Sequence, residues 1–154
     1  AVPMYVLWTK FGLTGGLSGL VLAYLGLTIP LNVWMLSIFI KEIPFELEEA
    51  AAIDGCSYMR ILWGIVVPLI KPGISVTSVF TFRTAWNEFL LAIILSNRST
   101  RTLPAAVSLM ISDLGINWGQ IMAMATIIAI PAFIVTFACS KNLITGMTAG
   151  AVKG

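Results

Sequence analysis

The sequence has no histidine and only two cysteines, so it is poor in the side chains that most often bind transition metals. Cys56 and Cys139 lie far apart and form no CxxC pair, and we interpret both as small apolar residues. Neither the GxSxG pattern of a serine hydrolase nor a phosphate-binding GxxxxGK[S/T] loop occurs. The sequence therefore predicts no metal site, no disulfide framework and no cofactor site. It also predicts no catalytic centre, and so not an enzyme.

Charged residues are also scarce. They make up 10% of the 154 residues, against about a quarter in a typical soluble domain. Hydrophobic residues make up 58%, and the mean hydropathy is +0.97. The small net charge of +2 and the lack of a basic run argue against nucleic-acid binding. This composition predicts an integral membrane protein.

Three stretches are long and apolar enough to cross a bilayer, which takes about 20 helical residues. Residues 15–40 and 119–140 contain no charged side chain, and residues 73–96 contain Arg83 and Glu88. Because lipid offers the backbone no hydrogen-bond partner, these stretches are expected to be helices. We predict an all-α membrane protein, a single transmembrane domain with these three spans.

Two shorter apolar segments, residues 2–13 and 103–111, are each predicted to lie at the membrane surface as a short helix or a loop. Lysine and arginine predict the orientation, since they gather on the cytoplasmic side. With the loop 41–72 and the C-terminus in the cytoplasm, five basic residues lie inside and three outside. The first residue would then lie outside without a signal peptide, so we expect further spans before it. The basic residues are Lys41, Arg60, Lys71, Lys141 and Lys153 inside, and Lys10, Arg98 and Arg101 outside.

Acidic residues are concentrated in one place, because five of the seven lie between Lys41 and Gly55. Pro44 suits the first turn of a helix and Gly55 suits its end, so we predict a helix at approximately 44–54. This helix is too short to cross a bilayer, and its alanines would allow another surface to approach closely. It fits either a protein groove lined with basic side chains or an ordinary solvated loop.

The spacing around this helix resembles the EAA signature of permease subunits in ATP-binding-cassette (ABC) importers. The signature here reads Glu49-Ala50-Ala51, three residues, Gly55, nine residues, Ile65, one residue, Val67-Pro68, with valine in place of the usual leucine. The segments IPFELEEAAAIDG, WNEFLLAIIL, TLPAAV and GMTAGAVKG extend the resemblance over nearly the whole sequence. They are similar to the carbohydrate-uptake branch of the family, which includes maltose-type and glycerol-phosphate-type permeases.

The resemblance implies a multi-pass protein of the cytoplasmic (inner) membrane of a prokaryote, usually with six spans, of which these would be the last three. It implies that the helix at 44–54 is the coupling helix, which contacts an ATPase subunit through Glu49, Ala50, Ala51, Asp54 and Gly55. The implied partners are two ATPase subunits that bind and hydrolyse ATP, a homologous second permease, and an extracytoplasmic binding protein that delivers a sugar-like solute.

Polar residues also cluster in the predicted second span, where several follow a helical spacing along one stripe. Such a face could line the translocation pathway, with Trp86 and Phe89 stacking on a sugar ring, or it could contact a neighbouring span. In the outer loop, Arg98, Arg101 and Asp113 could contact the binding protein or be solvated. The candidate pathway residues are Thr77, Thr81, Arg83, Thr84, Asn87 and Glu88.

Two other functions remain open at this point. The EAA spacing is shared by importers of other solutes, so a permease for a polyamine or a phosphonate also fits. A membrane scaffold that takes part in no transport, and whose acidic helix only holds a partner, is the second alternative.

Overall fold

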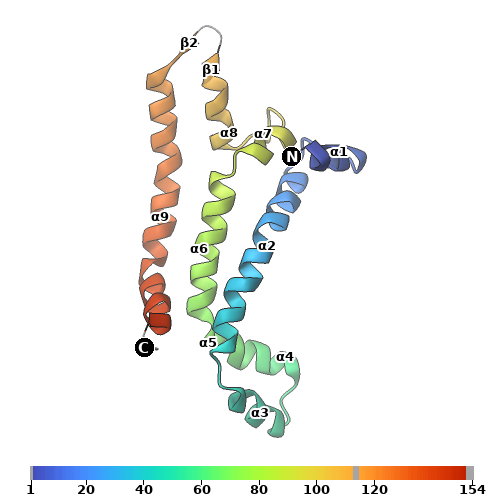
Figure 1. Cartoon of the computed structure of the whole chain (residues 1–154), viewed down its shortest axis with the longest axis vertical. Helices are drawn as coiled ribbons and strands as arrows, with labels where there is room; N and C mark the ends of the chain where they lie inside the picture. Colours follow the sequence, from blue (N-terminus) through green and yellow to red (C-terminus); the bar gives the residue numbers. More distant parts are fainter. Residues whose placement is uncertain (1, 113–114, 152–154) are drawn as a thin grey trace. The chain divides into compact units, whose positions relative to one another are not determined.

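The computed structural model describes residues 2–112 and 115–151, and almost all of them are helical (Figure 1). This confirms the predicted all-α fold class. One short hairpin interrupts the helices, in which β1 (Ile111–Ser112) pairs with β2 (Gly115–Ile116). The helices are α1 (Val2–Lys10), α2 (Leu17–Lys41), α3 (Phe45–Ile53), α4 (Tyr58–Ile61), a π-helix (Leu62–Val66), α5 (Val67–Leu69), α6 (Lys71–Asn87), α7 (Leu90–Leu95), α8 (Leu103–Val107), a 3-10 helix (Ser108–Met110) and α9 (Trp118–Ala151).

Two helices of the described chain are long and apolar enough to cross a membrane, judged by length and composition. They are α2, at Leu17–Lys41, and the part of α9 at Trp118–Cys139. The count rises to three if the bent pair Tyr58–Leu69 and Lys71–Asn87 forms one span. The runs without charge that were singled out in the sequence thus lie in α2 and α9.

The predicted second span does not form one helix. Its first part is α6, which ends at Asn87, and α7 begins only at Leu90. At the other end of α6, the segments Tyr58–Leu69 and Lys71–Asn87 meet at a bend of 74°. Pro72 explains this bend, because it cannot donate a helical hydrogen bond and its ring crowds the preceding turn.

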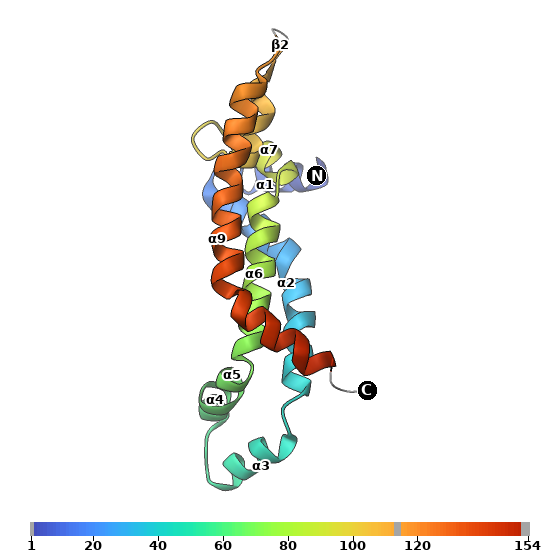
Figure 2. The same cartoon turned by 90° about the vertical axis from the view of Figure 1, so that its left-hand side faces the viewer.

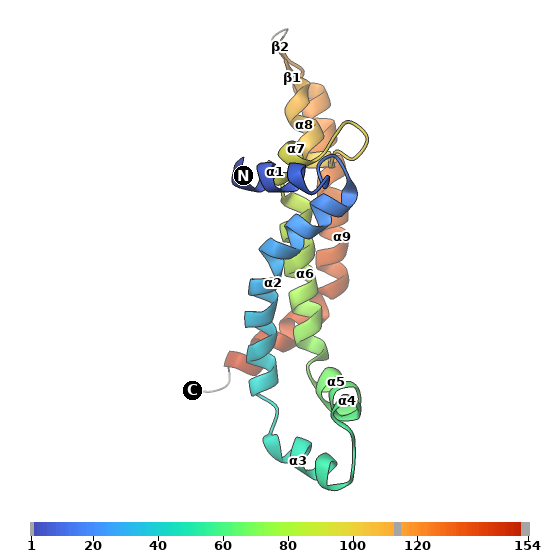
Figure 3. The ribbon, with the colours of Figure 1, turned by 90° about the vertical axis from the view of Figure 1, so that its right-hand side faces the viewer.

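The chain folds into two compact units, which we describe separately. The first unit consists of Ala1–Ile29 and Phe82–Val135. In it, α1 lies beside α7 (Figure 3), and the indole N–H of Trp8 donates to the carbonyl oxygen of Gly19 at 2.8 Å. A side chain at Gly19 would collide with the carbonyl of Leu13, so glycine is required there. The core of this unit comprises Leu20, Ala23, Leu91, Ala92, Leu95 and Ala105.

The second unit consists of Pro30–Thr81 and Thr136–Gly154. It holds α3 and α4, which are joined by a tight turn (Figure 2). Gly73 allows α6 to lie close to Phe39 of α2, since a Cβ atom there would lie 2.4 Å from the ring. The core of this unit comprises Ala51, Ile61, Val66 and Ile70, flanked by Phe39, Ile43, Cys56, Leu62, Ile65 and Ile74.

Both segments that were predicted to form a short helix or a loop contain a short helix. The segment 2–13 forms α1, which ends at Lys10. The segment 103–111 forms α8 and one 3-10 turn, after which Ile111 is already in β1. Asp113, a predicted contact of the binding protein, lies outside the described residues.

Candidate functional site

The acidic helix α3 has two sharply defined ends. Pro44 occupies the N-cap position, and Glu46 and Glu48 lie in the first turn, where the helix dipole favours negative charge. At the other end, Gly55 has a φ of +79°, a conformation that disfavours other residues. The N–H of Gly55 donates to Ala52 and that of Cys56 to Ala51, each at 3.0 Å. These two bonds form a Schellman motif, which closes the helix and turns the chain away.

The two alanines of the EAA signature lie on different sides of α3. Ala50 is exposed, whereas Ala51 is only 8% exposed and belongs to the core formed with Ile61, Val66 and Ile70. Ala51 therefore holds α3 against α4 and the π-helix rather than facing outward. The other four residues predicted as partner contacts are exposed, namely Glu49, Ala50, Asp54 and Gly55.

Two large apolar residues on α3 were not among the predicted contacts. Phe45 is 66% exposed and Ile53 is 85% exposed. Together with Glu49 they follow an i, i+4, i+8 spacing, so they share one stripe of the helix. This stripe presents a carboxylate between two apolar side chains. The i, i+4, i+8 spacing is the signal in the sequence that could have identified this stripe. Exposed apolar side chains that share one face of a helix are typical of a contact with another protein.

Two small cavities also lie beside α3, and each combines a carboxylate with apolar walls. One has a volume of about 210 Å³ and includes Glu48 and Tyr58. The other has a volume of about 230 Å³ and includes Glu42 and Leu47. Such cavities suit side chains that join an apolar stem to a positive charge, such as lysine or arginine.

Two of the polar residues predicted to line a pathway are bonded within the second unit. Thr77 is buried, and its hydroxyl donates to the carbonyl of Gly73 at 2.8 Å. The Thr81 hydroxyl lies 2.7 Å from Oδ1 of Asn32 on α2 and 2.9 Å from the carbonyl of Thr77, and it can donate to either. These hydroxyls therefore join helices or satisfy backbone groups, which corresponds to the alternative of contact with a neighbouring span.

The next polar residues of α6 are exposed. Arg83, Thr84 and Asn87 all lie at the surface of the described structure. The Asn87 amide N–H donates to the carbonyl of Arg83 at 2.9 Å, and its Oδ1 atom is an acceptor. This group offers donors and acceptors to a solute or to another subunit.

Glu88 lies at the break between α6 and α7. Its Oε1 and Oε2 atoms accept hydrogen bonds from the backbone N–H groups of Leu91 and Ala92 at 2.9 and 3.0 Å. Both carboxylate oxygens thus satisfy the first turn of α7, where the helix dipole also favours a negative charge. The buried hydroxyl of Tyr24 lies close to the same carboxylate. Glu88 therefore fixes the start of α7.

The aromatic residues near this break differ in their surroundings. The indole N–H of Trp86 donates to the carbonyl of Ile128 at 3.0 Å, and its ring stacks on Phe82 with centroids 5.4 Å apart. Phe89 is the N-cap residue of α7 and is exposed. In the following loop, Arg98 and Arg101 are both exposed.

Comparison with known proteins identifies the family. The family described as "Binding-protein-dependent transport system inner membrane component" matches residues 1–148. A diacetylchitobiose uptake system permease protein of Streptomyces coelicolor is 34% identical over 99% of this chain and 56% of its own length. A trehalose/maltose transport system permease protein of Thermococcus litoralis is 35% identical, over 94% of this chain and 53% of its own.

An inner membrane ABC transporter permease protein of Escherichia coli is 36% identical over 99% of this chain and 55% of its own length. The chain thus spans about half the length of these three curated relatives. Since the family match covers nearly the whole sequence, the chain belongs to the binding-protein-dependent transport system inner membrane components, the multi-pass permeases of ABC transporters.

Proposed function

We propose that this chain forms part of the permease subunit of an ATP-driven importer for a sugar or a sugar derivative. Relatives over nearly the whole chain carry names that refer to diacetylchitobiose and to trehalose or maltose, which supports a saccharide as the solute class. The solute arrives from an extracytoplasmic binding protein. Two ATPase subunits supply ATP hydrolysis, and a homologous second permease completes the pathway.

The observation that carries this proposal is the exposed stripe of α3, with Glu49 between Phe45 and Ile53. In our proposal this stripe docks into a groove of the ATPase, where a basic side chain pairs with Glu49 and apolar side chains cover its two neighbours. Closing of the ATPase subunits on ATP then displaces α3 as a rigid body. Because Ala51 packs α3 against α4 and the π-helix, the displacement reaches the membrane helices through this core.

For the pathway itself, we retain Arg83, Thr84 and Asn87 as candidates, because their polar groups are exposed and suit sugar hydroxyls. Thr77 and Thr81 are already hydrogen-bonded within the chain. The carboxylate of Glu88 likewise accepts hydrogen bonds from the backbone of α7. We assign these three residues to holding the pathway helix in shape rather than to contact with the solute.

The experiment is purification of the full-length permease with its neighbouring subunits, carrying Glu49→Lys. The unchanged protein should retain an ATPase whose hydrolysis rises with solute-loaded binding protein. Glu49→Lys should lose the ATPase while still inserting into the membrane. Lys10→Glu, a charge reversal at the exposed end of α1, serves as the control and should retain it.

Normal, solute-stimulated hydrolysis in Glu49→Lys would exclude coupling through α3. If the unchanged complex retains no ATPase, the chain is a scaffold. Uptake of polyamine or phosphonate in place of sugar would overturn the proposed solute class alone.

A further inference from the structure

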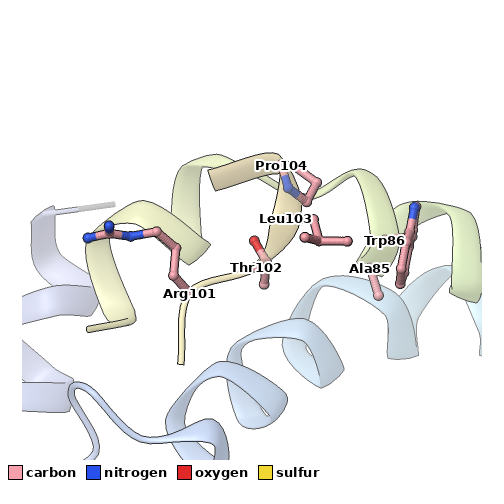
Figure 4. A pocket seen from close by; sticks show the side chains of 6 residues that line it. All are labelled: Ala85, Trp86, Arg101, Thr102, Leu103 and Pro104. Carbon is pink, nitrogen blue, oxygen red and sulfur yellow. The ribbon is translucent and has the colours of Figure 1, made fainter. Parts of the chain in front are cut away.

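A cavity of about 330 Å³ lies in the first unit, between the end of α6 and the start of α8 (Figure 4). Binding sites for small molecules have volumes of about 300 Å³ or more, so this cavity can hold one sugar ring rather than a longer chain. The six polar candidates for the pathway do not line it, whereas Trp86, which the sequence suggested for stacking on a sugar ring, does. Its walls are formed by Ala85, Trp86, Arg101, Thr102, Leu103 and Pro104.

The Trp86 ring forms one wall and is held in place from outside the cavity. Its N–H is bonded to Ile128 at 3.0 Å, and Phe82 stacks on it at an interplanar angle of 18°. In Figure 4 the ring is seen nearly edge-on, so that one face is turned toward Leu103 and Thr102. A fixed indole face is a suitable surface for the apolar C–H face of a pyranose ring, with which it forms a flat contact.

The Thr102 hydroxyl is a second feature of this cavity that indicates a bound ligand. Its Oγ1 atom is buried, and within the part of the chain that the structure describes it has no hydrogen-bond partner. Although Thr102 is the N-cap residue of α8, its side chain does not cap that helix. A buried hydroxyl without a partner lowers stability, so such groups usually bind a ligand or a water molecule. A solute hydroxyl in this cavity would satisfy it.

Arg101 lines the edge of the same cavity, and in Figure 4 its side chain extends away from Trp86. Its side chain is exposed, and the guanidinium group has five N–H donors and no acceptor. An aromatic face, a neutral hydroxyl and a guanidinium together match a ring that bears several hydroxyls. The mostly apolar wall does not suit a small inorganic anion, which would need several charged or backbone donors.

The geometry points to an outer subsite for the transported solute, in which one pyranose ring stacks on Trp86 and hydrogen-bonds to Thr102, with Arg101 at the edge of the site. This inference rests on the proposed sugar import. It assigns a part of the selectivity to residues outside the polar face of α6.

The test uses the full-length permease with its partner subunits and binding protein in lipid vesicles. Radiolabelled maltose, trehalose and diacetylchitobiose are offered, and the sugar that the unchanged transporter takes up fastest serves as the probe. Thr102→Val and Trp86→Ala should each raise the KM for uptake about three- to tenfold, the loss expected for one buried hydrogen bond or one stacked ring. ATPase association should not change.

Thr102→Val also separates binding from folding, because valine keeps the shape and removes the unsatisfied hydroxyl. The thermal midpoint of the variant should therefore stay the same or rise while the KM rises. The matched controls are Thr126→Val, whose exposed hydroxyl bonds to Met122, and Trp118→Phe, which lies outside the cavity. Both should leave the KM unchanged.

An unchanged KM in Thr102→Val and Trp86→Ala would overturn the subsite and leave sugar import standing. An equal rise of the KM in the control variants would overturn it as well, since the effect would not belong to this cavity. If the unchanged transporter takes up none of the three sugars, the proposed sugar import itself fails, and the subsite fails with it.

Discussion

Replacing Ala51 by leucine should destabilise the protein, whereas the same replacement at the neighbouring Ala50 should not. Ala51 is 8% exposed and packs in the core with Ile61, Val66 and Ile70. A larger side chain there forces its neighbours apart, which typically costs about 1–3 kcal/mol of the free energy of unfolding. Ala50 is exposed, and leucine is nearly as good a helix former as alanine, so we expect a change within about 0.5 kcal/mol.

The assay is thermal unfolding of the full-length permease in detergent, together with retention of the ATPase during purification. Ala51→Leu should lower the thermal midpoint. Ala50→Leu should keep the midpoint and lose ATPase, because its side chain would stand between α3 and the docking groove. Equal midpoints in the two variants, or stable ATPase binding by Ala50→Leu, would refute the division of the two alanines between core and contact.

Three further predictions concern backbone positions and the break in the second span. Gly55→Ala should destabilise the end of α3 by about 1–2 kcal/mol, since the left-handed conformation disfavours alanine, while Gly55→Asn should cost less; thermal midpoints of both variants check this, and equal losses would contradict it. Glu88→Ala should cost about 1–3 kcal/mol by leaving two N–H groups of α7 without partners, and Glu88→Gln should recover part of this by keeping one acceptor. Protease resistance of the loop after α7 is the measurement, and full resistance in Glu88→Ala would exclude the capping role. Gly73→Ala should cost about 1–3 kcal/mol through its collision with Phe39, and Phe39→Leu in the same protein should restore part of the thermal midpoint; additive losses would show that the two residues do not collide.

Much of the helical architecture could be predicted from the sequence, because its physical causes are local. The charge-free runs set the positions of α2 and α9, since a long apolar segment has few alternatives to a helix in lipid. Pro44 and Gly55 set the ends of α3 through their own backbone preferences. These signals need no knowledge of what packs against the helix.

The break between α6 and α7 could not be predicted in the same way. Glu88 precedes Phe89, the N-cap residue, and glutamate is not a preferred residue near that position. It caps α7 only because the chain has already turned at Asn87, so that the N–H groups of Leu91 and Ala92 point at its carboxylate. In the sequence alone, Glu88 therefore looked like one more member of a polar stripe.

The candidate contact on α3 was predicted in part. The EAA spacing identified Glu49 and Ala50, which are exposed, but it gave no means to separate Ala50 from Ala51. Which alanine is buried depends on where α4 and the π-helix lie, because Ile61 and Val66 form the core with Ala51. Phe45 and Ile53 were not predicted as contacts, because the EAA signature does not include them.

Photocross-linking from position 53 tests the central claim most directly. A benzophenone amino acid replaces Ile53, which is 85% exposed, in the assembled full-length transporter, and a second sample carries it at Phe11, which is 69% exposed. The account predicts a cross-link from position 53 to the ATPase subunit and none to the ATPase from position 11. A cross-link from position 53 to the binding protein, or to lipid alone in a complex that contains the ATPase, would contradict it.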